Sequence, residues 1–194
     1  MCRTVIFIDG AIGVGKSTLI KFLFSNLKTV LEETYKDKRQ SHGFRLDVLK
    51  EPMRNSEAEE ILRDCDYTEV LRFILARKAE VISNWNKEIA ADGLQELEKN
   101  ILIVERSFEG DLSVRDRRDI EIPQCAFGYS RQIYLMLCDP VLNSEEQARV
   151  SREYTEMECS PKKDRIILRA TRPADLHGYI AIVHRIAGMI LKYF

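Results

Sequence analysis

The chain has 194 residues, of which 45% are hydrophobic and 31% are charged. These fractions lie near those of ordinary globular proteins and exclude a chain that is disordered throughout. The 30 Lys and Arg residues are balanced by 31 Asp and Glu residues, for a formal charge of −1, which argues against a surface devoted to nucleic acid or anionic lipid. This length is typical of one domain, predicted to span residues 1–194.

The spacing of the cysteines and the length of the apolar runs indicate the cellular compartment of the protein. The five cysteines lie far apart and form no Cys-x-x-Cys pair, a pattern typical of reduced thiols rather than of disulfides or a zinc site. No apolar run approaches the roughly 18 residues that a membrane helix needs, and the first residues lack the features of a signal peptide. We therefore expect a soluble, cytoplasmic protein that binds neither a membrane nor nucleic acid.

Apolar and β-branched runs predict a series of short strands, which in chain order cover residues 5–8, 44–49, 101–104, 133–137 and 166–168. Helical spacing of apolar residues is found over residues 18–24, 57–97 and 180–194. Residues 32–43 are polar and charged and are predicted to lie at the surface, residues 111–121 are densely charged, and Asn100 breaks the helical pattern before the third strand. Strands that alternate with helices predict an α/β fold, with a parallel sheet covered by helices on both faces.

The strongest motif lies between the first predicted strand and the first predicted helix. It matches G-x-x-x-x-G-K-[ST], the phosphate-binding P-loop, in the context that this motif requires. Its residues are Gly10, Ala11, Ile12, Gly13, Val14, Gly15, Lys16 and Ser17, followed by Thr18. The glycines let backbone N–H groups close around phosphate oxygens, Lys16 neutralises the terminal phosphates, and the Ser17 hydroxyl is a magnesium ligand. The motif predicts a nucleoside triphosphate, ATP, bound with Mg²⁺.

Two shorter segments follow the second and third predicted strands: Glu51-Pro52-Met53 and Glu105-Arg106-Ser107. Taken in order with the P-loop, they resemble the deoxynucleoside kinase family, which includes deoxycytidine, deoxyguanosine and mitochondrial thymidine kinases. The resemblance implies a P-loop kinase fold and transfer of a phosphoryl group from ATP to the 5′-hydroxyl of a deoxynucleoside, a step of nucleotide salvage. It also implies a homodimer, for which the apolar helical region 57–97 is a candidate surface.

The side chains in these two segments fit a phosphoryl transfer. Glu51 is predicted to accept the proton of the sugar 5′-hydroxyl as its oxygen attacks the γ-phosphate. Arg106 is predicted to hold Glu51 and the phosphoryl oxygens, on which negative charge develops in the transition state. Glu105 follows a strand at the carboxyl edge of the sheet, where P-loop folds place a carboxylate for Mg²⁺. The alternatives are a solvated carboxylate at position 51 and a surface ion pair at 105 and 106.

Three further residues are matched to the second substrate. Asp111 and Arg77 resemble the Asp and Arg with which deoxycytidine and deoxyguanosine kinases read the base, and Tyr67 is a candidate for contact with the sugar. The family carries a Gln in Phe-Gln-x-Tyr upstream of that arginine, whereas the stretch 67–73 has none. Base preference is therefore open, and both charged residues also fit a solvated helical face.

A lid over the ATP phosphates is predicted around residues 140–155. Arg149 and Arg152 lie three positions apart, on one helical face, from which both could reach one triphosphate. An exposed charged helix has the same composition.

Two other functions stay open for the chain. One is a thymidylate kinase-like enzyme that phosphorylates a nucleoside monophosphate, because the stretch 71–80 resembles a helix of that family. The other is a non-catalytic nucleotide-binding subunit. The presence of Lys16, Glu51 and Arg106 argues against the latter.

Overall fold

The computed structural model of the chain describes residues 3–35, 43–49, 66–91, 98–114, 119–123, 131–142, 144–159 and 165–192. Its strands are β1 (Arg3–Asp9), β2 (Gly43–Leu49), β3 (Glu98–Glu105), β4 (Arg131–Cys138) and β5 (Arg165–Thr171). Its helices are α1 (Lys16–Tyr35), α3 (Tyr67–Ala91), α4 (Phe108–Val114), α5 (Glu145–Cys159) and α6 (Leu176–Lys192). Each of these strands overlaps one predicted from the sequence, so the predicted succession of strands is confirmed.

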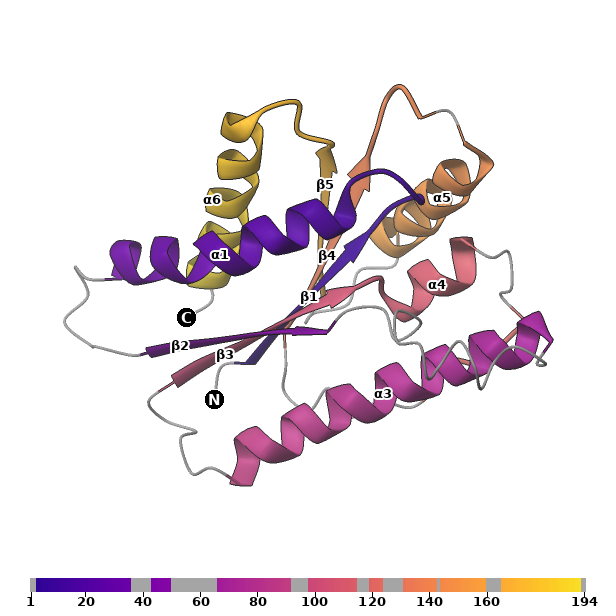
Figure 1. Cartoon of the computed structure of the whole chain (residues 1–194), viewed down its shortest axis with the longest axis horizontal. Helices are drawn as coiled ribbons and strands as arrows, with labels where there is room; N and C mark the ends of the chain where they lie inside the picture. The colour runs from indigo at the N-terminus through magenta and orange to yellow at the C-terminus, as the bar shows by residue number, and fades with distance from the viewer. Residues whose placement is uncertain are drawn as a thin grey trace.

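The strands form one parallel sheet in the order β2-β3-β1-β4-β5. β1 lies at its centre, where Ile6 pairs with Ile103 of β3 on one side and Ile133 of β4 on the other. All seven residues of β1 are buried, as expected for a strand covered on both faces. Parallel pairing brings the carboxyl ends of β1 and β3 together, so Asp9 and Glu105 lie at the same edge of the sheet (Figure 1).

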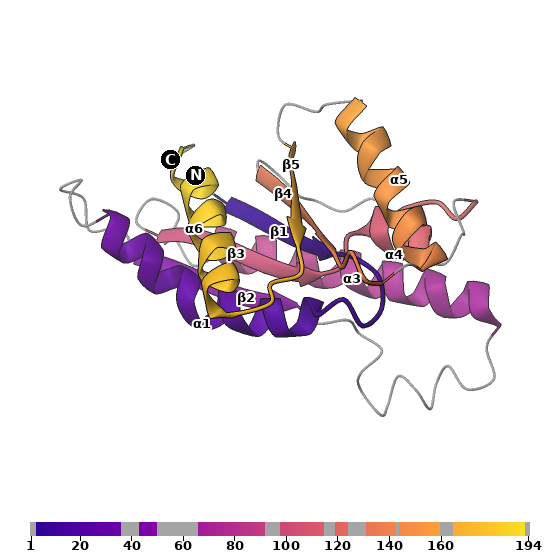
Figure 2. The same cartoon turned by 90° about the horizontal axis from the view of Figure 1, so that it is seen from above.

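Side chains of the strands alternate between two apolar layers, one on each face of the sheet. On the first face, Ile6 and Ile8 pack with apolar residues of α1 and α6. On the second face, Val5 and Phe7 pack with apolar residues of α3, α4 and α5. Figures 1 and 2 show α6 lying against α1 in both views. The predicted α/β fold is thus confirmed, and within the described residues no helix is long and apolar enough to cross a membrane.

The structure differs from the predicted boundaries at two places. Residues 32–35 continue α1, although they are predicted to belong to a charged surface segment. Their charge does not prevent helix formation, because a helix needs only one apolar face for packing. β3 begins at Glu98, before the start of the predicted strand at residue 101, so Asn100 lies inside it. The predicted helical residues 57–65 and 92–97 lie outside the described part of the chain.

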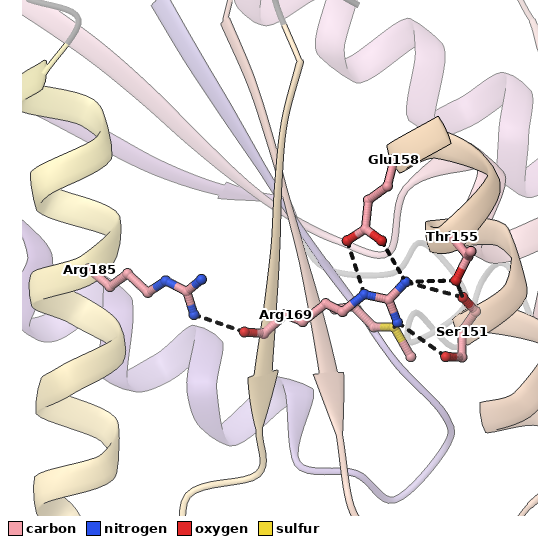
Figure 3. A network of polar contacts seen from close by, with 6 residues as sticks. Ser151, Thr155, Glu158, Arg169 and Arg185 are labelled. Carbon is pink, nitrogen blue, oxygen red and sulfur yellow. Dashed lines mark hydrogen bonds and ion pairs between the residues drawn. The ribbon is translucent and has the colours of Figure 1, made fainter. Parts of the chain in front are cut away.

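The side chain of Arg169 on β5 fixes α5 to the sheet (Figure 3). Its guanidinium donates to the hydroxyls of Ser151 and Thr155 at 3.2 and 2.9 Å and to both carboxylate oxygens of Glu158 at 3.0 Å. The bond from Arg169 lowers the pKa of the Glu158 carboxyl. On the opposite face, the backbone carbonyl of Arg169 accepts a hydrogen bond from Arg185 of α6 at 2.9 Å. One strand residue therefore holds a helix on each face.

Candidate active site

The loop from Gly10 to Gly15 joins β1 to α1 and depends on glycine conformations. Gly13 and Gly15 have φ angles of 80° and 97°, in the region that favours glycine. Gly10 has a φ of 142°, and a Cβ there would lie 2.4 Å from the carbonyl oxygen of Leu137. The glycines of the motif thus permit the tight turn after which α1 begins at Lys16.

A cavity of about 450 Å³ opens at this loop. It is lined by the loop, the first turn of α1 and the end of β3, through Ile12, Gly13, Gly15, Lys16, Ser17, Thr18, Glu105 and Arg106. The other motif residues, Gly10, Ala11 and Val14, are buried and do not line it. The free N–H groups and dipole of a helix N-terminus favour an anion. The cavity therefore combines a helix N-terminus with two cationic side chains, an arrangement suited to a polyphosphate.

The ammonium of Lys16 is buried and turned back onto the loop. Its Nζ donates to the carbonyl oxygens of Gly10 at 3.0 Å and Ala11 at 2.8 Å. Burial, reinforced by the nearby charge of Arg106, lowers the pKa of Lys16 to about 8, while the carboxylate of Glu105 acts in the opposite direction. A poorly solvated cation of this kind gains strongly from an anion placed in the cavity.

Ser17 and Glu105, the two predicted magnesium ligands, lie together. The Ser17 hydroxyl donates to the Glu105 carboxylate at 3.0 Å. Within the described ranges, no group of three or more His, Cys, Asp or Glu side chains could hold a metal ion. Mg²⁺ is commonly held by one or two protein oxygens together with phosphate oxygens and water. The pair therefore fits a Mg²⁺ ion that is bound together with a polyphosphate.

Arg106 lines the same cavity from the turn after β3. Its φ of 65° is the one positive value for a non-glycine residue in the described part of the chain. Its backbone N–H donates to the carbonyl of Ile8 at 3.1 Å. The side chain is buried, and among the described residues its Nε and Nη1 have no hydrogen-bond partner. A buried guanidinium with open donor positions is suited to a phosphate or carboxylate ligand.

Glu146 of α5 places a carboxylate against the loop and Arg106. Its Oε1 accepts hydrogen bonds from the Ile12 N–H at 3.0 Å and from Arg106 Nη2 at 3.4 Å. A loop N–H and an arginine are donors that a phosphate oxygen would use, so Glu146 competes with an anion for both. Sequence reasoning missed this residue, because no motif spacing connects the first turn of α5 with the P-loop.

Asp9, which the sequence analysis also missed, is fully buried at the end of β1. It accepts hydrogen bonds from the Ser107 N–H at 2.8 Å and the Tyr154 hydroxyl at 2.7 Å. Burial, with the charge of Asp9 adding to it, raises the pKa of Tyr154, so its hydroxyl remains a donor. A Cβ on Gly110 would lie 2.0 Å from the Asp9 Oδ1, so the site requires glycine there. The available sequence signal was the place of Asp9 directly before the motif.

The structure does not bring the predicted base-reading pair together. Arg77 is exposed and pairs with Glu80 on the same helix at 2.5 Å. Asp111 is fully buried, and the cation that meets it is Lys78, the residue after Arg77. The helical period explains this arrangement, because it turns Lys78 into the apolar face of α3 and Arg77 out of it. Contact of Arg77 and Asp111 with a base stays a prediction. Tyr67 is exposed at the first residue of α3, and its contact with a sugar stays a prediction.

The predicted lid arginines lie on α5 but do not line the cavity. Arg152 is exposed, and Arg149 forms an ion pair with Glu145 of the same helix at 3.5 Å. From this helix it is Glu146 that contacts the loop. Closure of the two arginines over ATP therefore stays a prediction.

Glu51, the predicted base, lies outside the described residues. β2 ends two residues before it at Leu49, which pairs with Val104 of β3. Glu51 thus comes after β2 in the sequence. β2 pairs with β3, the strand that ends at Glu105, directly before Arg106.

Neither a protein-family model nor a curated protein matches the chain. Among solved structures, it is similar to thymidylate kinase from Ehrlichia chaffeensis, with a TM-score of 0.48 and 14% sequence identity. The alignment covers 96% of this chain and 99% of that one. A similarity of this strength assigns no substrate.

Tyr154→Phe is expected to lower the free energy of unfolding by about 1–3 kcal/mol, because it leaves a buried oxygen of Asp9 without its donor. Urea denaturation measures the change. Tyr179→Phe is the matched control, since Tyr179 is only partly buried, and it should change stability by less than about 0.5 kcal/mol. Equal stability of the two variants would show that the Tyr154 bond does not stabilise the site.

ATP binding is expected to weaken as the pH rises through the Lys16 pKa of about 8. A bound phosphate raises the pKa of Lys16. At a pH above the pKa of the free protein, Lys16 must therefore take up a proton when ATP binds, and Kd rises by up to about tenfold per pH unit. Calorimetric titration from about pH 7.5 upward measures this, a range in which phosphate, with a second pKa of about 6, is fully ionised. Lys16→Met should bind weakly and without this pH dependence. A constant Kd for the unaltered chain would contradict the prediction.

Proposed function

We propose that the chain is an ATP-dependent kinase that phosphorylates the 5′-hydroxyl of a deoxynucleoside. The observation that carries the proposal is the open guanidinium of Arg106 in the cavity that also contains Lys16 and the Ser17–Glu105 pair. A P-loop accounts for binding of a triphosphate. A buried arginine beside it, two of whose nitrogens have no hydrogen-bond partner among the described residues, would bind the phosphoryl oxygens, on which charge develops during transfer.

The choice of a deoxynucleoside as acceptor rests on the sequence. The Glu-Arg-Ser segment at 105–107 and Glu51 are the features, beyond the P-loop, that resemble deoxynucleoside kinases. The first begins at the last residue of β3 and the second comes after β2 in the sequence. These two strands are neighbours, which supports one shared site at this edge of the sheet. A cytoplasmic homodimer formed through α3 is part of the same proposal.

In the proposed reaction, the phosphates of ATP bind to Lys16, the loop N–H groups and the N-terminus of α1. Ser17 and Glu105 would hold Mg²⁺, which neutralises phosphate charge when bound. Arg106 donates to the oxygens of the γ-phosphoryl group with Nε and Nη1, which have no partner in the described part of the chain. Glu146 releases the two donors that it occupies, and phosphate oxygens take its place.

The transfer itself needs one base. The 5′-oxygen of the acceptor bonds to the γ-phosphorus as the bond from that phosphorus to the β,γ-bridging oxygen breaks. The bridging oxygen leaves on ADP with the electron pair, and the proton of the hydroxyl passes to the Glu51 carboxylate. Lys16 and Arg106 are themselves buried, which limits the water that would compete with the acceptor.

The proposal is tested by measuring ADP formation from MgATP with each natural deoxynucleoside and, separately, with thymidine monophosphate. We expect turnover of at least one deoxynucleoside and formation of its 5′-monophosphate. Turnover of thymidine monophosphate alone would replace the proposal with thymidylate kinase-like chemistry. ATP binding without turnover of any acceptor would replace it with a non-catalytic nucleotide-binding role.

Glu51→Gln is expected to lower kcat by about 10²-fold or more, because an amide cannot accept the hydroxyl proton. ATP affinity should stay unchanged, since Glu51 faces the acceptor in the proposed reaction. Steady-state kinetics and ATP titration separate the two effects. Glu145→Gln is the control, because its side chain is 83% exposed. A kcat near that of the control would mean that another group takes the proton.

Glu146→Gln is expected to bind ATP about tenfold more tightly, a gain of about 1.4 kcal/mol. The substitution keeps an oxygen that can accept from Ile12 and removes the negative charge that repels phosphate. ATP titration at low ionic strength measures the change, because salt screens it. Glu145→Gln, one residue away on the same helix, should have little effect. Unchanged or weaker binding by Glu146→Gln would contradict competition between this carboxylate and the triphosphate.

A further inference from the structure

Lys78 is a buried charge that the proposed reaction does not use. It lies on the face of α3 that packs on the sheet, in line with Leu71, Leu75 and Ile82, and its side chain is 0% exposed. Burial of an ammonium group is unfavourable unless it is paired and hydrogen-bonded. An ammonium group in this apolar stripe therefore needs compensating contacts, and these contacts indicate the role of Lys78.

Among the described residues, Lys78 Nζ has two polar contacts, both with the segment that follows β3. It forms an ion pair with Asp111 of α4, and it donates to the backbone carbonyl of Arg106 at 3.0 Å. It also lies 5.8 Å from the centre of the Phe108 ring, within the range of a cation–π contact. The charge of Lys78 is thus satisfied by α4 and by the turn that carries Arg106.

The left-handed backbone conformation at Arg106 needs stabilising contacts. A φ of 65° is unfavourable for a residue with a Cβ, and such conformations persist only where the surroundings fix them. At this turn the Arg106 N–H donates to Ile8, the Arg106 carbonyl accepts from Lys78, and the Ser107 N–H donates to Asp9. The backbone on both sides of the Arg106 Cα is therefore fixed, and the direction of its side chain follows.

We propose that Lys78, paired with Asp111, is a positioning residue that holds the Arg106 backbone in its left-handed conformation and thereby keeps the guanidinium in the phosphate cavity. The inference rests on the proposed function in assigning the transferred phosphoryl group to Arg106. Lys78 and Asp111 are both fully buried, and neither lines the cavity. Lys78 therefore acts through Arg106 and not by contact with the substrates.

The test uses a replacement that keeps the fold. Lys78→Met alone leaves Asp111 buried without its ion-pair partner, which is strongly destabilising, whereas an apolar pair of similar volume in place of a buried ion pair is often tolerated. The variant is therefore Lys78→Met/Asp111→Leu, and cooperative urea unfolding checks that it folds. Lys87→Met, at an exposed position of the same helix, is the control.

We expect the double variant to lower kcat by about 10²-fold, as for loss of one aligned donor to a transition state, with the KM for ATP and for the acceptor nearly unchanged. Adding Arg106→Ala should lower kcat no further than Arg106→Ala alone, because both changes remove the same interaction. Wild-type kcat in the double variant, or effects that multiply, would overturn the inference. A higher KM for the acceptor with kcat intact would also overturn it, in favour of direct contact with that substrate.

A crystal structure of the double variant separates this inference from the proposed function. We expect the Arg106 φ to leave the positive region and the guanidinium to turn from the cavity, whether or not any acceptor is phosphorylated. An unchanged turn would overturn the inference even in an active enzyme. If Arg106→Ala itself turns over at the wild-type rate, the assigned role of Arg106 fails and the inference fails with it.

Discussion

Burial of a carboxylate at the end of β1 is the constraint on which the site depends. Asp9 is fully buried there, and a buried charge without partners is strongly unfavourable. Its donors come from Ser107, directly after the turn that follows β3, and from Tyr154 of α5. The central strand, that turn and α5 therefore meet at one point. Arg106 directly precedes one of the two donors, so its place at the cavity follows from the same contact.

The two buried cations at the cavity, Lys16 and Arg106, explain why this edge of the sheet is suited to an anion. Lys16 bonds to carbonyls of its own loop, and its lowered pKa reflects poor solvation. Two guanidinium nitrogens of Arg106 have no hydrogen-bond partner among the described residues, and the third, Nη2, donates to Glu146. A polyphosphate would supply acceptors to donors that are already in place. Because little ordering would remain to be done on binding, such a site is pre-organised for charge that develops in its cavity.

A feature of this structure can be predicted from the sequence where its signal lies in neighbouring residues. β1 and β3 are predictable because strands buried on both faces read as continuous apolar runs, and the P-loop is predictable because its chemistry requires fixed spacing. Lys78 carries a local signal that was overlooked: it stands in the apolar stripe three residues after Leu75 and four before Ile82. The contacts of Tyr154 with Asp9 and of Glu146 with the loop had no such signal, since the tertiary packing of α5 brings these two residues into place.

The anchoring of α5 bears on how a triphosphate could enter. Arg169 binds this helix at Ser151, Thr155 and Glu158, and Asp9 binds it at Tyr154, so its central and final turns are tied to the sheet. Glu146 lies in the first turn, before the first of these bonds, and in the described part of the chain its carboxylate accepts from the Ile12 N–H and from Arg106. Phosphate can therefore displace Glu146 by rotation of one side chain, while the body of the helix stays in place. A lid formed by the same helix would instead have to break the bonds to Arg169, which makes displacement of a carboxylate the less costly route to an open site.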